Sequence, residues 1–299
     1  MRKKNIGSQI ANAFCVDLEE WFHICGVETQ YLEVSTWDQA EECVVRGTHL
    51  LLDLLDEANA KGTFLVLGWV AEKYPKLIQE ISDRGHECGC HGYYHRLVFE
   101  QTPAEFRIEV SDARARVQDL TGQVVECFRA PSFSITAEVL WAFDILAEEG
   151  FKTDISVVPA TRADGGIDRF DRFPFLLHTE RGNINVYPVS VMRILRKTIP
   201  FSGGGYLRFF PLSLIERGFR QNHEMGLPVM TYIHPREVMP EQPRLALPLF
   251  KRFKYYHGLE RCLTKLRALL STYQFTTVSG VLEEYGPLPE RTLRNGIIT

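Results

Sequence analysis

Two histidines lie four residues apart in a short segment, residues 85–95, that is rich in glycine, cysteine and tyrosine (GHECGCHGYYH). This spacing predicts that the rings of His91 and His95 lie on one side of a helical turn, close enough to share a metal ion. A catalytic zinc ion takes three protein ligands and keeps one position for water, so one carboxylate would complete such a site. Cys88 and Cys90 could instead belong to a structural metal site. The sequence offers no second half for one, and buried cysteine more often packs as a small hydrophobic residue.

Carboxylates directly follow the apolar run 13–16, because the chain continues as Asp17, Leu18, Glu19 and Glu20. Acids in this position either form a functional site or are simply a polar strand end, and their place after a buried run favours the first. Arg129 and His234 also follow apolar runs, and Asp154 is a further candidate. Taken alone, Arg129 is either a salt-bridged structural residue or a clamp for a carboxylate. His234 alone is better interpreted as a structural histidine.

Short β-type runs alternate with helical patterns, which predicts an α/β fold with a mostly parallel sheet, either open or closed into a barrel. The expected strands span 13–16, 62–67, 123–128, 152–158, 228–233 and 274–278, and the expected helices 41–60, 71–84, 136–149 and 258–271. A further helix begins at Pro103, with Thr102 as its N-cap. Residues 160–211 follow no regular pattern and are expected to form a long loop region. Such folds form their active sites at the carboxyl ends of the strands, where the candidate residues lie.

The formal net charge of −4 argues against nucleic-acid binding through overall charge. The seven cysteines lie mostly within apolar runs, which is typical of reduced core cysteine rather than of a disulfide framework. The basic residues 1–4 are not followed by the apolar core of a signal peptide, and no run approaches the ~18 apolar residues of a membrane span. We therefore expect a cytoplasmic protein. Basic residues between 244 and 267 could bind an anionic polysaccharide, a lipid pyrophosphate or an anionic membrane face, and the last would bring the protein to the inner membrane face. A solvated helix face is the simpler interpretation.

Taken in order, these segments resemble the polysaccharide deacetylase family with the NodB homology domain. The resemblance runs from about Phe14 to Pro235. It implies a distorted (β/α) barrel and a divalent metal, usually zinc, that serves the hydrolysis of acetyl groups on sugars. The family's first motif normally reads T-F-D-D-G, and the segment Cys15 to Glu20 departs from it.

The resemblance also implies a role for each candidate. Asp17 would be the catalytic base and Glu19 a metal ligand, together with His91 and His95, although the choice between the two acids stays open. Arg129 would hold the base, the backbone N–H of Ser132 would stabilise the oxyanion, His234 would be the general acid and Asp154 the acid that tunes it. Trp21 and Tyr94 flank the metal motifs and could stack on sugar rings, or they could simply pack at the barrel mouth.

Three further stretches, 17–22, 203–208 and 275–278, resemble the subgroup found beside exosortase (PEP-CTERM) exopolysaccharide loci. This implies a single domain over 1–299, with a core at about 13–240 and a carboxy-terminal extension at about 200–285 packed on it. The implied activity is hydrolysis of a carbon–nitrogen bond, namely N-deacetylation of an amino-sugar polysaccharide or its lipid-linked precursor. Two alternatives remain: a metal-dependent hydrolase of small cyclic imides or ureides, and a barrel that binds polysaccharide without turnover.

Overall fold

A twisted, mostly parallel sheet forms the centre of the computed structural model, which describes residues 10–24, 31, 33–161 and 165–299. Its strand order is β10-β1-β2-β3-β4-β5-β7-β6-β12-β13, and β11 also pairs with β1. The pairs from β10 to β7 are parallel, whereas β6 runs antiparallel to β7. The sheet strands are β1 (Asn12–Leu18), β2 (Thr63–Val66), β3 (Glu87–Cys90), β4 (Cys127–Phe128), β5 (Thr153–Asp154), β6 (Phe175–Thr179), β7 (Gly182–Val186), β10 (Met230–Ile233), β11 (Phe275–Thr276), β12 (Glu290–Arg294) and β13 (Ile297–Ile298).

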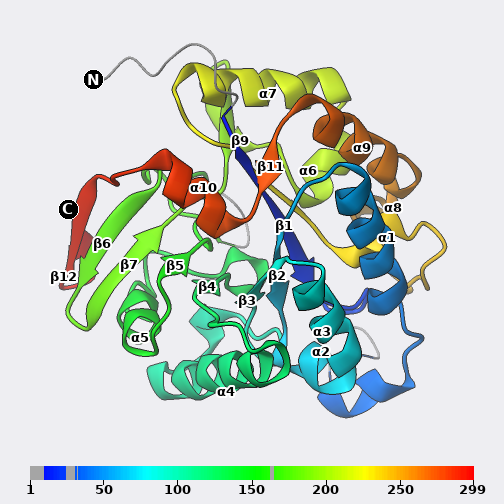
Figure 1. Cartoon of the computed structure of the whole chain (residues 1–299), viewed down its shortest axis with the longest axis horizontal. Coiled ribbons are helices and arrows are strands. Elements are labelled where there is room, and N and C mark those ends of the chain that lie inside the picture. The colour runs from blue at the N-terminus through cyan, green and yellow to red at the C-terminus, as the bar shows by residue number, and fades with distance from the viewer. Residues whose placement is uncertain (1–9, 25–30, 32, 162–164) are drawn as a thin grey trace.

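Helices surround the strands, as Figure 1 shows for the arc from α1 through α4 to α5, for α7 at the top and for α9 beside α1. They are α1 (Val44–Glu57), α2 (Gly68–Lys73), α3 (Pro75–Asp83), α4 (Pro103–Thr121), α5 (Ala142–Glu148), α6 (Gly204–Phe209), α7 (Leu212–Glu224), α8 (Leu249–Tyr256), α9 (Cys262–Thr272) and α10 (Val278–Tyr285). No pairing among the described strands joins β10 to β13. The predicted α/β fold is confirmed, and its sheet is not closed by hydrogen bonds.

The two faces of the sheet pack into separate apolar clusters, because side chains alternate along each strand. Phe14, Val16 and Leu18 belong to the large outer cluster beneath the helices. Ala13 and Cys15 belong to a smaller inner cluster, whose other members include Leu65, Cys127, Ile155, Met230 and Tyr232. Helix α10 covers this inner cluster at the amino ends of the strands: Val278 and Val281 pack into it, and the Val278 amide donates to Thr63 Oγ1 over 2.8 Å. The carboxyl ends of the strands face the opposite way.

Several expected elements differ in detail. The helix predicted over 71–84 is two helices, α2 and α3, that meet at Tyr74, because Pro75 disfavours a helical conformation at the residue before it. The predicted strands 123–128 and 152–158 shorten to the two-residue strands β4 and β5. The region 160–211, expected to be a loop, contains β6, β7, α6 and a separate hairpin of β8 (Val191–Ile194) and β9 (Lys197–Pro200).

Two expectations for α4 and the cysteines agree with the structure. Thr102 caps α4, and its side chain and that of Glu105 form a reciprocal capping box. The six cysteines among the described residues are all buried and free of disulfides, whereas Cys25 lies outside the described residues. No helix in the described part of the chain is long and apolar enough to cross a membrane.

Candidate active site

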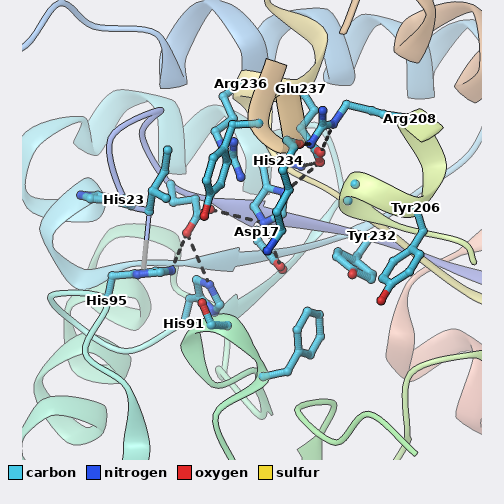
Figure 2. A pocket seen from close by; sticks show the side chains of 18 of the residues that line it. Asp17, His23, His91, His95, Tyr206, Arg208, Tyr232, His234, Arg236 and Glu237 are labelled. Carbon is cyan, nitrogen blue, oxygen red and sulfur yellow. Dashed lines mark hydrogen bonds and ion pairs between the residues drawn. The ribbon is translucent and has the colours of Figure 1, made fainter. Parts of the chain in front are cut away.

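The candidate residues gather at the carboxyl ends of the strands because they continue the inner rows of side chains. Asp17 follows Ala13 and Cys15 on β1, and residues two apart on a strand share a face. In the same way Arg129 follows Cys127 of β4, and His234 follows Tyr232 of β10. The pocket they form has a volume of about 530 Å³, and Figure 2 shows Asp17, His91, His95 and His234 together in it.

Glu19, His91 and His95 form a compact set of potential metal ligands. Their ligand atoms lie within 4.8 Å of one another. Glu19 Oε2 is 2.6 Å from His95 Nε2 and 3.9 Å from His91 Nε2. The pair does not lie on a helical turn as predicted. His91 and His95 belong to the irregular segment after β3, and His95 adopts a left-handed backbone conformation with φ of 56°.

The environment of His91 prepares it as a ligand. Its Nδ1 lies 2.8 Å from the carbonyl oxygen of Arg129. Because a carbonyl only accepts, Nδ1 carries the proton and donates, so the lone pair of Nε2 faces Glu19. Burial lowers the pKa of His91 to about 4, which keeps the ring neutral near pH 7. A neutral imidazole and a carboxylate that face each other need a proton or a cation between them, so this donor set fits a divalent metal ion.

A buried ion pair fixes Asp17. Arg129 is fully buried, and its Nη1 donates to Asp17 Oδ1 over 2.5 Å. The second carboxylate oxygen of Asp17 lies 3.7 Å from His234 Nε2. Asp17 is itself 2% exposed and lines the pocket, so one oxygen is clamped by the arginine while the other faces the reaction space.

His234 is paired with Glu237. Its Nδ1 lies 2.8 Å from Glu237 Oε2, and Glu237 Oε1 accepts from Arg208 Nε over 2.7 Å. Burial alone would lower the pKa of His234, but the carboxylates of Glu19 and Glu237 raise it. Its Nε2 lies 3.3 Å from Glu19 Oε1. Both carboxylates therefore favour the protonated form of the imidazole, the form that a proton donor needs.

The prediction that Asp154 tunes His234 is wrong, because Asp154 lies on the other face of the sheet. Its register partner in β4 is Phe128, which packs in the outer cluster, and its neighbour Ile155 packs in the inner one. Its carboxylate accepts from the backbone N–H and the hydroxyl of Ser156, and burial raises its pKa to about 7. Glu237 was missed from the sequence. The order His-Pro-Arg-Glu, with an acid three residues after an extended residue and a proline between them, was its signal.

Ser132 lies in the wall of the pocket, at the 3-10 turn Pro131–Phe133. Both Ser132 (φ 54°) and Phe133 (φ 59°) adopt left-handed backbone conformations. Such conformations are costly for residues other than glycine and persist at sites where the backbone must point in a required direction. The turn brings the Ser132 backbone to the same pocket as Asp17 and His234.

Neither predicted sugar-stacking residue lines this pocket. Trp21 is 3% exposed, packs edge-on against Phe22 and donates its indole N–H to the Glu41 carbonyl oxygen, because it belongs to an aromatic core. Tyr94 lines a separate surface pocket beside α4. The aromatic side chains that line the catalytic pocket include Phe133, Tyr206 and Tyr232, and Figure 2 shows both tyrosines on the side away from His95.

Comparison with known families agrees with this geometry. Residues 32–150, which contain His91, His95 and Arg129, match the family model described as polysaccharide deacetylase. Over these residues the chain is similar to the polysaccharide deacetylase family. Residues 155–283, which contain His234, match a domain of unknown function (DUF3473). The expected resemblance to this family is confirmed over residues 32–150, and Asp17 and Glu19 precede both matched ranges.

Curated relatives share segments with this chain. YheN of Bacillus subtilis, assigned as a polysaccharide deacetylase, is 32% identical over 127 residues, which is 42% of this chain and 43% of that protein. The peptidoglycan-N-acetylglucosamine deacetylase of Bacillus cereus is 32% identical over 96 residues, covering 32% of this chain and 35% of that enzyme. The chain thus spans less than half the length of these relatives.

Solved structures share the fold. A Mycobacterium smegmatis protein assigned as a polysaccharide deacetylase is 20% identical, with a TM-score of 0.65 over 98% of this chain and 96% of the other. A 4-alpha-glucanotransferase from Thermococcus litoralis gives 0.59 at 14% identity, over 96% of this chain and 42% of the other. Because the second carries out a different reaction, the fold alone does not select the chemistry, and the site must do so.

Proposed function

We propose that this protein hydrolyses N-acetyl groups on amino-sugar glycans. The observation that carries the proposal is one pocket that brings together a Glu-His-His ligand set, a clamped aspartate and a carboxylate-paired histidine. Amide hydrolysis needs a base, an electrophilic centre and an acid for the leaving amine, and each of these groups can serve one of those needs.

Glu19, His91 and His95 would hold the metal ion, and zinc suits two imidazoles and one carboxylate. When bound, the ion would polarise the acetamide carbonyl and lower the pKa of water to about 7. Of the two acids in the first motif, we assign the ligand role to Glu19, since Asp17 already gives one oxygen to Arg129.

Two residues of the chain would each carry out one proton transfer. Asp17, oriented by Arg129, would take the proton of the attacking water. His234, kept cationic by Glu237, would protonate the nitrogen of the departing amine. The backbone N–H of Ser132 would donate to the developing oxyanion. Tyr206, half-buried in the wall of this pocket of about 530 Å³, offers a ring face on which a pyranose would stack.

Acetate release from N-acetylglucosamine oligomers tests this proposal. We expect the protein to release acetate, and we expect Asp17→Asn to reduce kcat by about 100-fold or more, the scale of general-base catalysis. Tyr94→Phe, outside the pocket, is the matched control and should keep wild-type kcat. Release of ammonia or ring-opened product from small ureides or cyclic imides, without acetate release from the oligomers, would instead support the alternative hydrolase.

We further propose that α8 brings this pocket to an anionic membrane surface, where a lipid-linked glycan precursor for exopolysaccharide synthesis would lie. Leu249, Phe250 and Phe253 on α8 are 82%, 79% and 55% exposed, and Lys251 and Arg252 lie between them. Exposed apolar side chains beside basic ones are typical of contact with anionic lipid headgroups. The cytoplasmic location and the exosortase-associated subgroup stay predictions from the sequence.

Vesicle sedimentation tests this contact. We expect the protein to sediment with phosphatidylcholine vesicles that contain phosphatidylglycerol, and to do so less as salt rises. Phe250→Ser should weaken sedimentation, whereas Leu195→Ser, at a 92% exposed position on the β8–β9 hairpin, should not. Equal sedimentation of both variants, or none by the wild type, would refute the membrane contact.

A further inference from the structure

Arg236 is a nearly buried cation that forms no ion pair with the described residues. It lies two residues after His234, is 8% exposed and lines the catalytic pocket, where Figure 2 shows it above His234. Its backbone carbonyl is fixed by Gln242, which donates to it over 2.6 Å. Its Nε, in contrast, is buried without a hydrogen-bond partner, and its guanidinium forms no ion pair with any described acid. A buried, unpaired charge is costly unless another group compensates for it.

A second cation lies on the same aromatic ring. The Arg236 guanidinium carbon is 5.6 Å from the centroid of the Tyr255 ring, and Lys254 Nζ is 5.9 Å from it. Lys254 and Tyr255 both line the pocket as well. Two like charges that flank one ring repel each other, so this wall of the pocket carries positive charge that the ring only partly balances.

The acids of the pocket are already engaged elsewhere. Glu237, next to Arg236 in the chain, directs one oxygen to Arg208 and the other to His234. Asp17 is paired with Arg129, and Glu19 lies within ion-pair distance of His91, His95 and His234. Each of these carboxylates therefore has a role in the ligand set or in a close pair, and none forms an ion pair with Arg236 or Lys254.

We propose that Arg236 and Lys254 form a subsite for an oxyanion carried by the substrate, a carboxylate or a phosphate. The inference rests on the proposed deacetylase function and narrows its substrate to an acidic glycan or a glycosyl phosphate. A guanidinium suits both anions because its fork of N–H donors matches two oxygens at once. The subsite lies beside His234, so the anion would orient the sugar with its amide near the general acid.

Selectivity between substrates tests the subsite during turnover. The kcat/KM for acetate release is measured on a neutral N-acetylglucosamine tetramer and on an acidic tetrasaccharide of alternating N-acetylglucosamine and glucuronate. We expect Arg236→Gln to lower the acidic-to-neutral ratio of kcat/KM at least tenfold, and Arg236→Lys to restore part of it. Lys197→Gln, which removes an exposed cation outside the pocket, is the matched control. An unchanged ratio in Arg236→Gln would overturn the proposal.

A binding measurement separates failure of the subsite from failure of the deacetylase function, because it needs no turnover. Wild type and Arg236→Gln are titrated with glucuronate and, separately, with inorganic phosphate, and binding is followed by NMR chemical shifts. We expect at least one anion to bind the wild type tenfold more tightly than the variant, and the preferred anion identifies the source of the charge. Any anion bound at the metal ligands would affect both proteins alike. Equal affinity of both proteins for both anions would overturn the subsite even if acetate is released.

Discussion

At the scale of single residues, His234 pairs with Glu237, which identifies Glu237 as the acid that stabilises the protonated form of this proposed proton donor. Glu19 and Glu237 both raise the pKa of His234, and Glu237→Gln removes the carboxylate that pairs with its Nδ1, so we expect kcat for acetate release to fall about 10- to 100-fold. Asp154→Asn should change kcat less than about threefold, because Asp154 faces the outer layer and bonds Ser156. The opposite ranking of the two variants would show that the assignment is wrong.

The sequence identified the residues of the site better than it identified which of them interact with one another. Asp17, Glu19, His91, His95, Arg129 and His234 could be selected because each follows a strand or an apolar run, and the structure brings these six together. Asp154 could not be excluded by the same reasoning. Its position near a strand end is equivalent to theirs, and only the pairing of Asp154 with Phe128 reveals that it faces outward. The sequence pattern predicts where a strand ends, but it does not predict to which side of the sheet a residue at that end points.

At the scale of elements, Gly89 shows how β3 positions His91. It lies between Cys88 and Cys90, which pack in the outer cluster, so position 89 faces the inner one. A Cβ at Gly89 would lie 2.6 Å from Leu65 Cδ1 and 2.9 Å from the Cys127 carbonyl oxygen. Only glycine allows β2, β3 and β4 to approach this closely. This close packing fixes the position of His91, two residues after Gly89.

Gly89→Ala should therefore push β3 away from its neighbours. We expect a loss of about 1–3 kcal/mol in the free energy of unfolding, measured by urea denaturation, and weaker metal binding through displaced His91. Gly122→Ala, at the end of α4 where a Cβ would meet nothing within 4 Å, is the control for metal affinity: its φ of 67° disfavours alanine and lowers stability, but its metal binding should match that of the wild type. Wild-type stability and metal affinity in Gly89→Ala would contradict this account of β3.

Element boundaries were predicted where local signals are strong and missed where tertiary pairing decides. The capping box at Thr102 fixed the start of α4 correctly. The H-x3-H spacing suggested a helical turn, yet the segment after β3 brings His91 and His95 together through a left-handed residue instead. The hairpins within 160–211 lacked an alternating pattern, and β6 and β7 form through antiparallel pairing with each other.

At the scale of the whole molecule, buried acids give the stability a pH dependence. Burial raises the pKa of Asp154 from 3.8 to about 7, so between about pH 4 and 7 the folded protein binds a proton that the unfolded chain has lost. Stability therefore falls as pH rises through this window, by up to about 1.4 kcal/mol per pH unit from this group. Asp154→Asn should remove that slope in urea unfolding midpoints compared with wild type. Parallel pH profiles for the two proteins would contradict the buried, neutral state of Asp154.

The pairing of the strands also explains why the two segments that match different family models form one site. Residues 32–150 supply His91, His95 and Arg129, and residues 155–283 supply His234, Glu237 and the Arg236 subsite. They meet because β10 pairs directly with β1, which carries Asp17. The site predicted from the order of the motifs therefore depends on the pairing of β1 with β10, which lie more than 200 residues apart in the chain. No local pattern in the sequence reveals this pairing.

The metal content of the purified protein is the most direct test of the central claim that Glu19, His91 and His95 form a catalytic metal site. We predict about one zinc per chain in the wild type and in Asp17→Asn, and loss of zinc in His91→Ala and Glu19→Ala. Acetate release should be lost in these two ligand variants and reduced about 100-fold or more in Asp17→Asn. A wild type that binds no divalent metal, or variants at His91 and Glu19 that retain it, would contradict the account.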